Sequence, residues 1–214
     1  MSALRFSSLI ILFPILFGAC GRSELIRIRM LAPVNEDKKD HAIFTDTTSS
    51  SSFTPVITNK NVGGSLYFLF KSIGLGYTTI TTKMEKVDEK LTEKTTLVTN
   101  FADVAFGIGE NYTFMWGAGV LTGGKWETSL EYESQTFNPK HNYLGGHSLF
   151  FVLGHHGFGF ETLLGYRTNF IKAEFEESNL PSDDVGKTGK DFTYESNKIS
   201  FTTSQVQLGI GFTF

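Results

Sequence analysis

The sequence is poor in the residues that mark several common protein classes. Among 214 residues it has one cysteine, Cys20, and five prolines. A lone cysteine excludes a disulfide within the chain. Beyond its first residues the chain has no apolar run of about 18 or more, which excludes a bundle of membrane-spanning helices. A net charge of −3 provides no positive field for nucleic acid. What is abundant, 21 phenylalanines and 22 glycines, favours paired β-structure.

Residues 1–21 have the layout of a secretory signal peptide. Arg5 precedes a short apolar run that ends in small residues around Cys20. Two processing routes stay open. Ordinary cleavage near 19–21, the slightly favoured route, removes the cysteine, whereas lipoprotein-type processing leaves Cys20 as an acylated first residue. Either route leaves residues 22–214 as a single domain.

Apolar and polar residues alternate with a period of two through most of that domain, which predicts strands. Short turns are expected at 71–72, 109–111 and 154–157, and longer polar loops at 35–59, 84–94, 135–144 and 176–196. Short and long connections alternate along the chain. This predicts an all-β fold, an antiparallel up-and-down transmembrane barrel of about eight strands. The expected strands are 24–34, 60–70, 73–83, 95–108, 112–134, 145–153, 157–175 and 197–214.

Gly123 and Gly124 leave the strand count open, because they permit either a hairpin or one long strand with a bend. Alternate residues from Tyr112 to Val120 share a face, and the same parity includes Trp126. This favours a single strand. A hairpin would also make the count odd and move the long loops to the wrong end. On this interpretation the larger aromatic residues face lipid: Tyr77, Tyr112, Trp116, Trp126, Tyr132 and Tyr166.

The last strand ends on a bare aromatic residue. Leu208, Ile210, Phe212 and Phe214 share one face, with glycines between them. This ending resembles the C-terminal recognition strand of bacterial outer-membrane β-barrels, and the whole pattern resembles small barrels of the OmpX, OmpA-domain and OmpW-like type. The resemblance implies an address in the outer membrane with both termini in the periplasm. It also implies that these four residues form the barrel-assembly signal.

The resemblance further implies outer-membrane lipid and the assembly machinery as partners, and a monomer whose loops are able to meet an extracellular partner. The expected role is structural, adhesive or in surface interaction, without catalysis or cofactor. Alternatives are a narrow channel or binder for a small apolar molecule, as in OmpW-like proteins, and a lipid-modifying barrel enzyme. A soluble lipocalin-like barrel is the rival fold, and it would turn the apolar face inward.

Seven charged residues fall on the face expected to point into the barrel. Because an eight-stranded barrel is just wide enough for side chains to fill, and unpaired buried charge is costly, they are expected to form a paired network rather than a gate. The predicted lumen charge network is Arg27, Arg29, Asp103, Lys125, Glu127, Glu161 and Arg167.

Catalytic and metal sites find little support in the sequence. His147 and Ser148, with Glu161 as a third member, suggest a hydrolase, but adjacent strand residues face opposite sides. His155 and His156 are adjacent too and lack a third ligand nearby. No catalytic residue and no metal ligand is therefore assigned.

Overall fold

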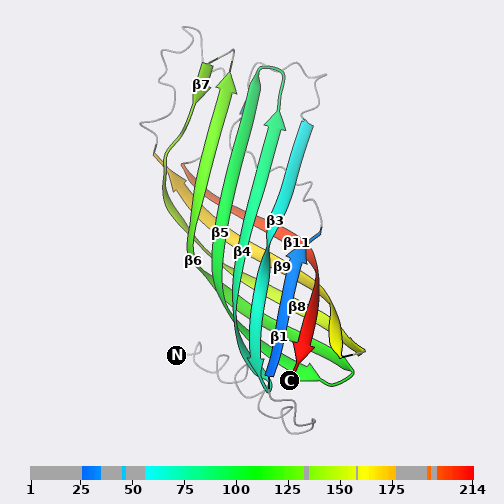
Figure 1. Ribbon diagram of the computed structural model, residues 1–214. Coiled ribbons are helices and arrows are strands. Elements are labelled where there is room, and N and C mark those ends of the chain that lie inside the picture. The colour runs from blue at the N-terminus through cyan, green and yellow to red at the C-terminus, as the bar shows by residue number, and fades with distance from the viewer. Residues whose placement is uncertain are drawn as a thin grey trace, which may run out of the picture.

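The computed structural model describes residues 26–34, 45–46, 56–132, 135–157, 159–176, 192–193 and 197–214. Nearly all of them lie in antiparallel strands (Figure 1). None of the helices in this part of the chain is long and apolar enough to cross a membrane. The predicted signal peptide and Cys20 lie outside the described residues. The strands are β1 (Ile26–Pro33), β2 (Thr45–Asp46), β3 (Val56–Phe70), β4 (Ile73–Val87), β5 (Leu91–Gly109), β6 (Tyr112–Tyr132), β7 (Gln135–Phe137), β8 (His141–Gly157), β9 (Phe160–Phe175), β10 (Phe192–Thr193) and β11 (Lys198–Thr213).

Eight of these strands close into a barrel. Their order is β5-β4-β3-β1-β11-β9-β8-β6, and the pairing of β5 with β6 completes the ring. The first and last strands meet as neighbours, since Ile26 and Phe214 exchange two backbone hydrogen bonds of 3.2 and 2.9 Å. The predicted antiparallel up-and-down barrel of eight strands is confirmed. We call the end that holds the short turns and Phe214 the lower end, as Figure 1 is drawn.

The turns at the lower end are tight. Lys71 and Ser72 join β3 to β4 as predicted, and Lys71 has a φ of 55°. Gly109, with a φ of 98°, ends β5 where an added Cβ would meet the carbonyl oxygen of Tyr112. The turn predicted at 154–157 is wrong, because these residues belong to β8, which continues to Gly157, and β9 begins at Phe160. The ladder contacts of His155 and His156 with β9 hold that segment in the strand.

Two of the predicted loops are also wrong, because their residues extend the strands. Residues 84–94 form the ends of β4 and β5, joined only through 88–90. Met84 and Leu91 face the interior there, with 7% and 1% of their surface exposed. Within 135–144, residues 135–137 form β7 and β8 begins at His141. The charged residues of these stretches suggested loops. Glu85 and Lys94 lie on the outer face of strands that continue upward, whereas Lys86 and Glu93 are buried, at 9% and 3% exposure.

The single long strand at Gly123 and Gly124 is observed as β6, but its parity is not continuous. A register shift between Asn100 and Phe101 of β5 places one extra β6 residue between Leu121 and Gly123. This β-bulge moves every later β6 side chain to the opposite face. Trp126 therefore points inward and is 6% exposed, contrary to the predicted lipid-facing position. Tyr132 is corrected in the same way, at 4% exposure.

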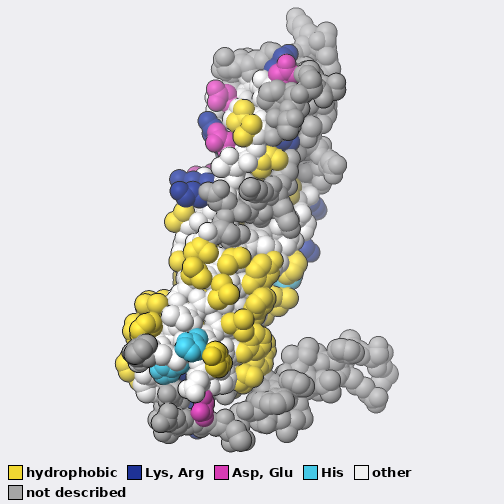
Figure 2. All heavy atoms as spheres, turned by 90° about the vertical axis from the view of Figure 1, so that its right-hand side faces the viewer, with side chains coloured by type: hydrophobic (Ala, Val, Ile, Leu, Met, Phe, Trp, Pro, Cys, Tyr) yellow, Lys and Arg dark blue, Asp and Glu magenta, His cyan; other side chains and the backbone are white. Residues whose placement is uncertain are grey.

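The lower half of the barrel carries its apolar residues on the outside. Figure 2 shows hydrophobic side chains gathered on the lower part of the face in view, the hydrophobic belt, with most charged side chains above them. Exposed members of this belt come from all eight barrel strands, among them Met30, Phe68, Leu75, Val104, Val120, Leu149, Leu164 and Leu208. A soluble barrel would reverse this arrangement, because apolar burial stabilises a fold in water.

The upper half of the barrel divides into two facing sheets. Pairing of β6 with β8 stops at Val120 and His147, and β1 ends at Pro33. Above these points β3 to β6 form one sheet with β7, and β8, β9 and β11 form another. Figure 1 shows the first sheet rising beyond the second. Their inner faces meet in two apolar clusters, one of Met84, Leu97, Trp126, Ile171 and Ala173, the other of Leu91, Leu130, Tyr132 and Phe175.

Candidate functional site

The candidate site is the interior of the barrel, where buried charge is held in two layers. In the lower layer the guanidinium of Arg29 forms a double hydrogen bond with Glu161, at 2.8 and 2.9 Å. Both residues have 0% of their surface exposed. Arg29 also donates to the hydroxyl of Thr113 at 2.8 Å. Arg27 lies nearby and donates to the carbonyl of Gly109 at 2.9 Å. A two-point carboxylate–guanidinium pair is the geometry that best compensates buried charge.

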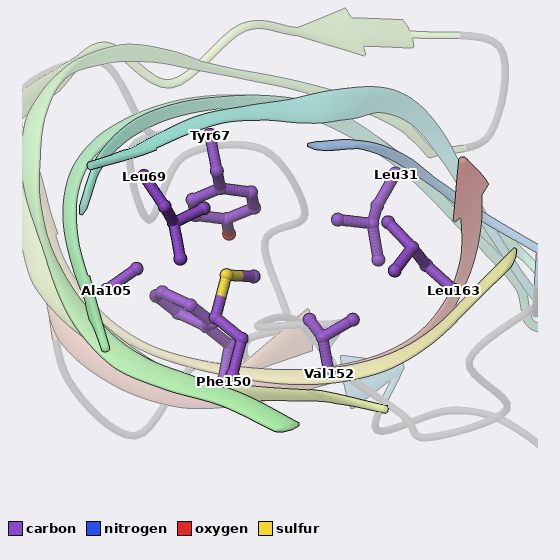
Figure 3. Close-up of a cluster of buried hydrophobic side chains, with 8 residues drawn as sticks. Leu31, Tyr67, Leu69, Ala105, Phe150, Val152 and Leu163 are labelled. Carbon is purple, nitrogen blue, oxygen red and sulfur yellow. The ribbon is translucent and has the colours of Figure 1, made fainter. Parts of the chain in front are cut away.

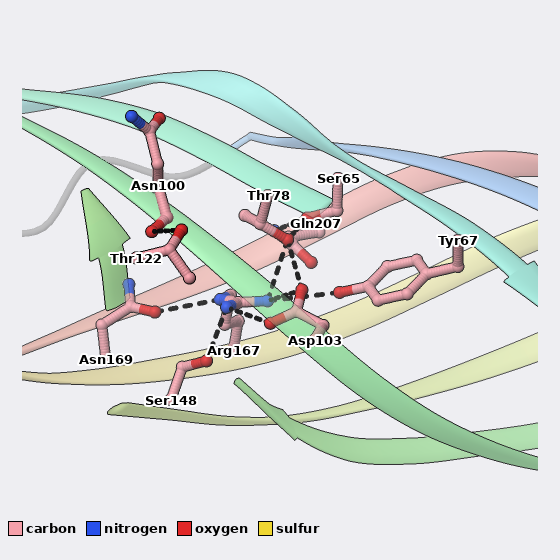
Figure 4. A network of polar contacts seen from close by, with 10 residues as sticks. All are labelled: Ser65, Tyr67, Thr78, Asn100, Asp103, Thr122, Ser148, Arg167, Asn169 and Gln207. Atoms are coloured by element: carbon pink, nitrogen blue, oxygen red, sulfur yellow. Dashed lines mark hydrogen bonds and ion pairs between the residues drawn. The ribbon is translucent and has the colours of Figure 1, made fainter. Parts of the chain in front are cut away.

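The upper charge layer has Arg167 at its centre. Its guanidinium donates to both carboxylate oxygens of Asp103, each at 2.9 Å, and both side chains are fully buried. Figure 4 shows the surrounding ring of polar partners. The further acceptors of Arg167 are Tyr67, Thr78, Ser148 and Asn169. With β3, β4, β5, β8 and β9 all contributing, this one arginine bonds to five strands of the barrel wall.

Aromatic rings complete the environment of Arg167. The guanidinium carbon lies 4.7 Å from the centre of the Phe101 ring and 5.4 Å from that of Phe150. Gly119 leaves the space for this arrangement, because a Cβ there would overlap Asp103 and crowd Ser148. The charged groups are thus enclosed by hydrogen bonds and ring faces, which compensates for the loss of water.

An apolar plug separates the two charge layers. Figure 3 looks along the barrel and shows these side chains pointing inward from the wall on all sides. The Tyr67 and Phe150 rings lie 5.1 Å apart, and the members are 0–4% exposed. The plug consists of Leu31, Tyr67, Leu69, Ala105, Met115, Phe150, Val152 and Leu163. Charge layers, plug and upper apolar clusters follow one another along the described interior, with further buried charged residues, Lys86, Asp88 and Glu93, towards its upper end.

The structure separates the seven predicted network residues into two groups. Arg27, Arg29, Asp103, Glu161 and Arg167 point into the lumen. Lys125 and Glu127 do not, because the β-bulge places them on the outer surface, where they pair with each other at 68% and 59% side-chain exposure. The prediction assumed that side chains alternate without interruption across Gly123, whereas the extra residue of the β-bulge reverses the alternation. The prediction that these two residues face inward is wrong.

Several uncharged polar residues of the interior, Asn169 and Thr82 among them, were not predicted from the sequence, whereas the parity of the last strand did place Gln205 and Gln207 inside. Asn169, for example, donates to Thr203 at 3.0 Å, and Thr82 donates to Asn61 at 2.7 Å. The Gln205 side chain is fully buried, and neither its amide nitrogen nor its oxygen has a partner in the described part of the chain. Every second residue on the strands of Arg167 and Asp103 faces inward with them, and so do the residues directly opposite on neighbouring strands. Polar residues at these positions could therefore have been predicted to lie inside the barrel.

The suggested catalytic and metal groups lie apart. Ser148 is buried and accepts a hydrogen bond from Arg167, while His147 is on the outside with its ring 4.9 Å from that of Phe170. His155 packs against Tyr112 with ring centres 4.9 Å apart. The described residues contain no group of three or more side chains arranged to hold a metal ion.

His141 closes the seam between β6 and β8 in the upper half. Its ring stacks on Trp126 at 4.5 Å and an interplanar angle of 11°, and its Nε2 lies 3.2 Å from the Thr128 hydroxyl. On the other side it meets the edge of Phe175 at 6.2 Å. Burial lowers the pKa of His141 to about 4. The folded protein therefore favours the neutral form of the His141 imidazole.

We expect acid to destabilise this seam. Because the folded-state pKa lies below the usual 6.5, the unfolded chain binds more protons between these values, and stability falls as the pH drops from about 6.5 towards 4. Thermal unfolding of the folded protein at pH 7 and pH 5 tests this. His141→Phe should reduce the difference between the two melting temperatures, whereas the exposed His155→Phe should not. An unchanged difference in His141→Phe would remove His141 as its source.

Comparison of the sequence with protein-family models and with curated proteins gave no match. Among solved structures, Neisserial surface protein A (NspA) is 11% identical, with 88% of this chain and 96% of that chain covered and a TM-score of 0.38. The outer membrane protein OprG from Pseudomonas aeruginosa is 11% identical, with 91% and 98% covered and a TM-score of 0.36. Likeness at this level carries no argument about function, which rests on the geometry of the chain itself.

Proposed function

We propose that this protein is an integral barrel of the bacterial outer membrane, with a closed lumen and a structural or surface-interaction role. The observation that supports it best is the inverted distribution of polarity. Arg29 and Arg167 are 0% exposed in the interior, whereas Leu75 and Leu149 are 68% and 54% exposed on the outside. This distribution suits a barrel in lipid and argues against a lipocalin-like barrel in water.

The extension above the belt is proposed as the part that meets extracellular partners. Its outer face carries threonine, lysine and glutamate, and its interior holds two apolar clusters beside buried polar residues such as Lys86 and Glu93. Edges and polar faces of such sheets offer backbone and side-chain hydrogen bonds to another molecule. Catalysis has no place in the proposal, because Ser148 and His147 face opposite sides of the wall.

The channel alternative ranks second. A conducting path would have to cross the plug around Tyr67 and Phe150, the Arg167–Asp103 pair and the upper apolar clusters. We therefore expect planar bilayers that contain the folded protein to show no ion conductance above the bare membrane. Steady single-channel steps would support the channel instead.

Two simple observations test the membrane assignment. The protein should require detergent for extraction from cells, and it should migrate differently on a gel before and after boiling, since a closed hydrogen-bonded barrel resists unfolding by detergent. Release into buffer without detergent and identical migration would contradict the proposal.

The terminal residue is proposed as part of the barrel-assembly signal, together with Leu208, Ile210 and Phe212. Phe214 is 71% exposed, yet its backbone pairs with Ile26 across the closing seam. Deleting Phe214 should reduce the heat-modifiable fraction in cell envelopes several-fold. Phe160→Ala, another exposed phenylalanine of the lower rim, serves as the control. Equal assembly of the two variants would deny Phe214 a recognition role.

A further inference from the structure

The outer surface of the barrel has a sharp electrostatic boundary at the upper edge of the hydrophobic belt. Below it, the described outward-facing strand positions carry no lysine, arginine, aspartate or glutamate. On six strands the first charged outward residue above the belt is a lysine, and on four of them it lies in the lowest charged row. These residues, the lysine tier, are Lys60 on β3, Lys83 on β4, Lys125 on β6 and Lys172 on β9.

The strand register places the lysine tier near one level. Lys60 and Lys83 lie directly opposite each other, and each is ten residues from the end of its strand at Phe70 or Ile73. At about 3.3 Å per residue and a tilt of about 40°, ten residues span about 25 Å along the barrel axis. That is about the height of the apolar band of outer-membrane barrels.

Lys125 and Lys172 reach a similar height on two other strands. Lys172 is twelve residues above Phe160 at the lower end of β9. Lys125 is thirteen above Tyr112, a count that includes the extra residue of the β-bulge. Since β6 is only two strands from β4 in the ring, three tier lysines lie on the β3–β6 side of the barrel and Lys172 lies on the far side. All four would lie at the headgroup level of one leaflet.

Carboxylates begin only one outward position higher. Glu85, Glu127 and Glu174 each follow a tier lysine by two residues on the same strand. Glu85 lies opposite Lys94 in the ladder and pairs with it at 3.7 Å, and Glu174 lies opposite Lys198. Lys125 contacts Glu127, but both side chains are largely exposed, and an exposed pair of this kind contributes little. The upper row is thus mixed in charge, while the tier is purely cationic.

Lys60 and Lys83 show the imbalance most clearly. Like charges directly opposite each other on neighbouring strands destabilise a sheet. In the described part of the chain neither lysine has an ion pair with a carboxylate, and both are exposed on the outer face. A bound anion between them would turn this repulsion into attraction.

We propose that the lysine tier binds the phosphate groups of lipid headgroups in the leaflet that faces away from the short turns. The inference rests on the proposed function, because it takes the belt to lie in a membrane. Lysine suits this role as a flexible point charge that reaches along the barrel wall to a phosphate. Basic residues near an anionic membrane surface strengthen its attraction for the protein. Among the described residues of the lower rim, which include Lys71 and Glu110 in the turns, there is no comparable group of lysines.

The test uses the full chain folded in nonionic detergent and titrated with a bisphosphorylated glycolipid, followed by native mass spectrometry. The variant is K60Q/K83Q/K125Q/K172Q. Its matched control, K90Q/K94Q/K140Q/K198Q, removes the same number of charges from positions above the tier. We expect the tier variant to bind the lipid at least tenfold more weakly and the control within about twofold of the unmodified protein. The same glycolipid without its phosphates should bind weakly to all three.

Equal loss in both variants, equal binding of the dephosphorylated lipid, or unchanged binding by the tier variant would overturn the proposal. Competition by millimolar inorganic phosphate at constant ionic strength would indicate a site for the free anion and would overturn the lipid assignment. Flotation of all three proteins with neutral lipid vesicles distinguishes a failure of the membrane assignment from a failure of the phosphate-binding proposal. Failure of the unmodified protein to insert would overturn the membrane assignment itself, whereas insertion without phosphate dependence would overturn only the lysine tier.

Discussion

Replacing Arg167 with methionine is expected to lower the free energy of unfolding by about 3–5 kcal/mol, the usual cost of removing one partner from a buried ion pair. The side chain of Asp103 would be left fully buried without its guanidinium partner, and Tyr67 and Asn169 would each lose a hydrogen-bond donor. Urea unfolding in lipid vesicles, followed by the change in gel migration, measures the effect. The surface variant Lys90→Met should change stability by no more than about 0.5 kcal/mol.

A second substitution separates lost pairing from lost packing. Asp103→Asn in the Arg167→Met background removes the orphaned charge and keeps the volume, so it should recover part of the lost stability. If Arg167→Met unfolds at the same urea concentration as Lys90→Met, the network does not stabilise the barrel. If the double variant is less stable than Arg167→Met, the cost does not arise from the unpaired carboxylate.

The second large effect is expected at the hydrophobic belt. Leu149 is 54% exposed on the outer face of β8, within the charge-free surface, and its ladder partner Thr168 is four residues below Lys172. Leu149→Arg places a charge in hydrocarbon, which costs about 2–4 kcal/mol near the bilayer midplane. Equilibrium unfolding from vesicles measures the loss, and a lower yield of folded barrel in cells should accompany it.

Val56→Arg is the matched control, since Val56 is 60% exposed on the outer face of β3 but lies above the lysine tier. In water this substitution should change stability by no more than about 0.5 kcal/mol. In a soluble barrel both positions would face water, and the two arginines would have equally small effects. Equal effects would therefore contradict the membrane assignment.

The barrel was predictable from the sequence because side chains alternate with a period of two along every strand. That parity also placed Arg29, Glu161, Asp103 and Arg167 inside, and the narrowness of the barrel required them to be paired. Their actual partners were not predictable. Which carboxylate meets which arginine depends on the register between strands such as β5 and β9, which are not neighbours in the sheet.

Two features of the fold were mispredicted from the alternation of side chains, each for a physical reason. The extra residue near Thr122 reversed the faces of β6, which turned Trp126 inward and Lys125 outward. A bulge of one residue has no clear mark in composition beyond the glycines beside it. Residues 84–94 have the composition of a loop because the ends of β4 and β5 carry lysines and glutamates on both faces, including the buried Lys86 and Glu93. Only a few inward apolar residues, such as Met84 and Leu91, indicate strands there.

The most direct test of the account uses the two tryptophans, the only ones in the chain. Trp116 lies on the outer belt, where its ring is 5.4 Å from that of Phe114, whereas Trp126 lies inside and is 6% exposed. Trp126→Phe and Trp116→Phe each leave a single fluorophore, to be measured in vesicles of lipids brominated on their acyl chains. The account predicts strong quenching of Trp116 and little quenching of Trp126. Equal quenching of the two, or an unquenched Trp116 in protein that floats with the vesicles, would contradict it.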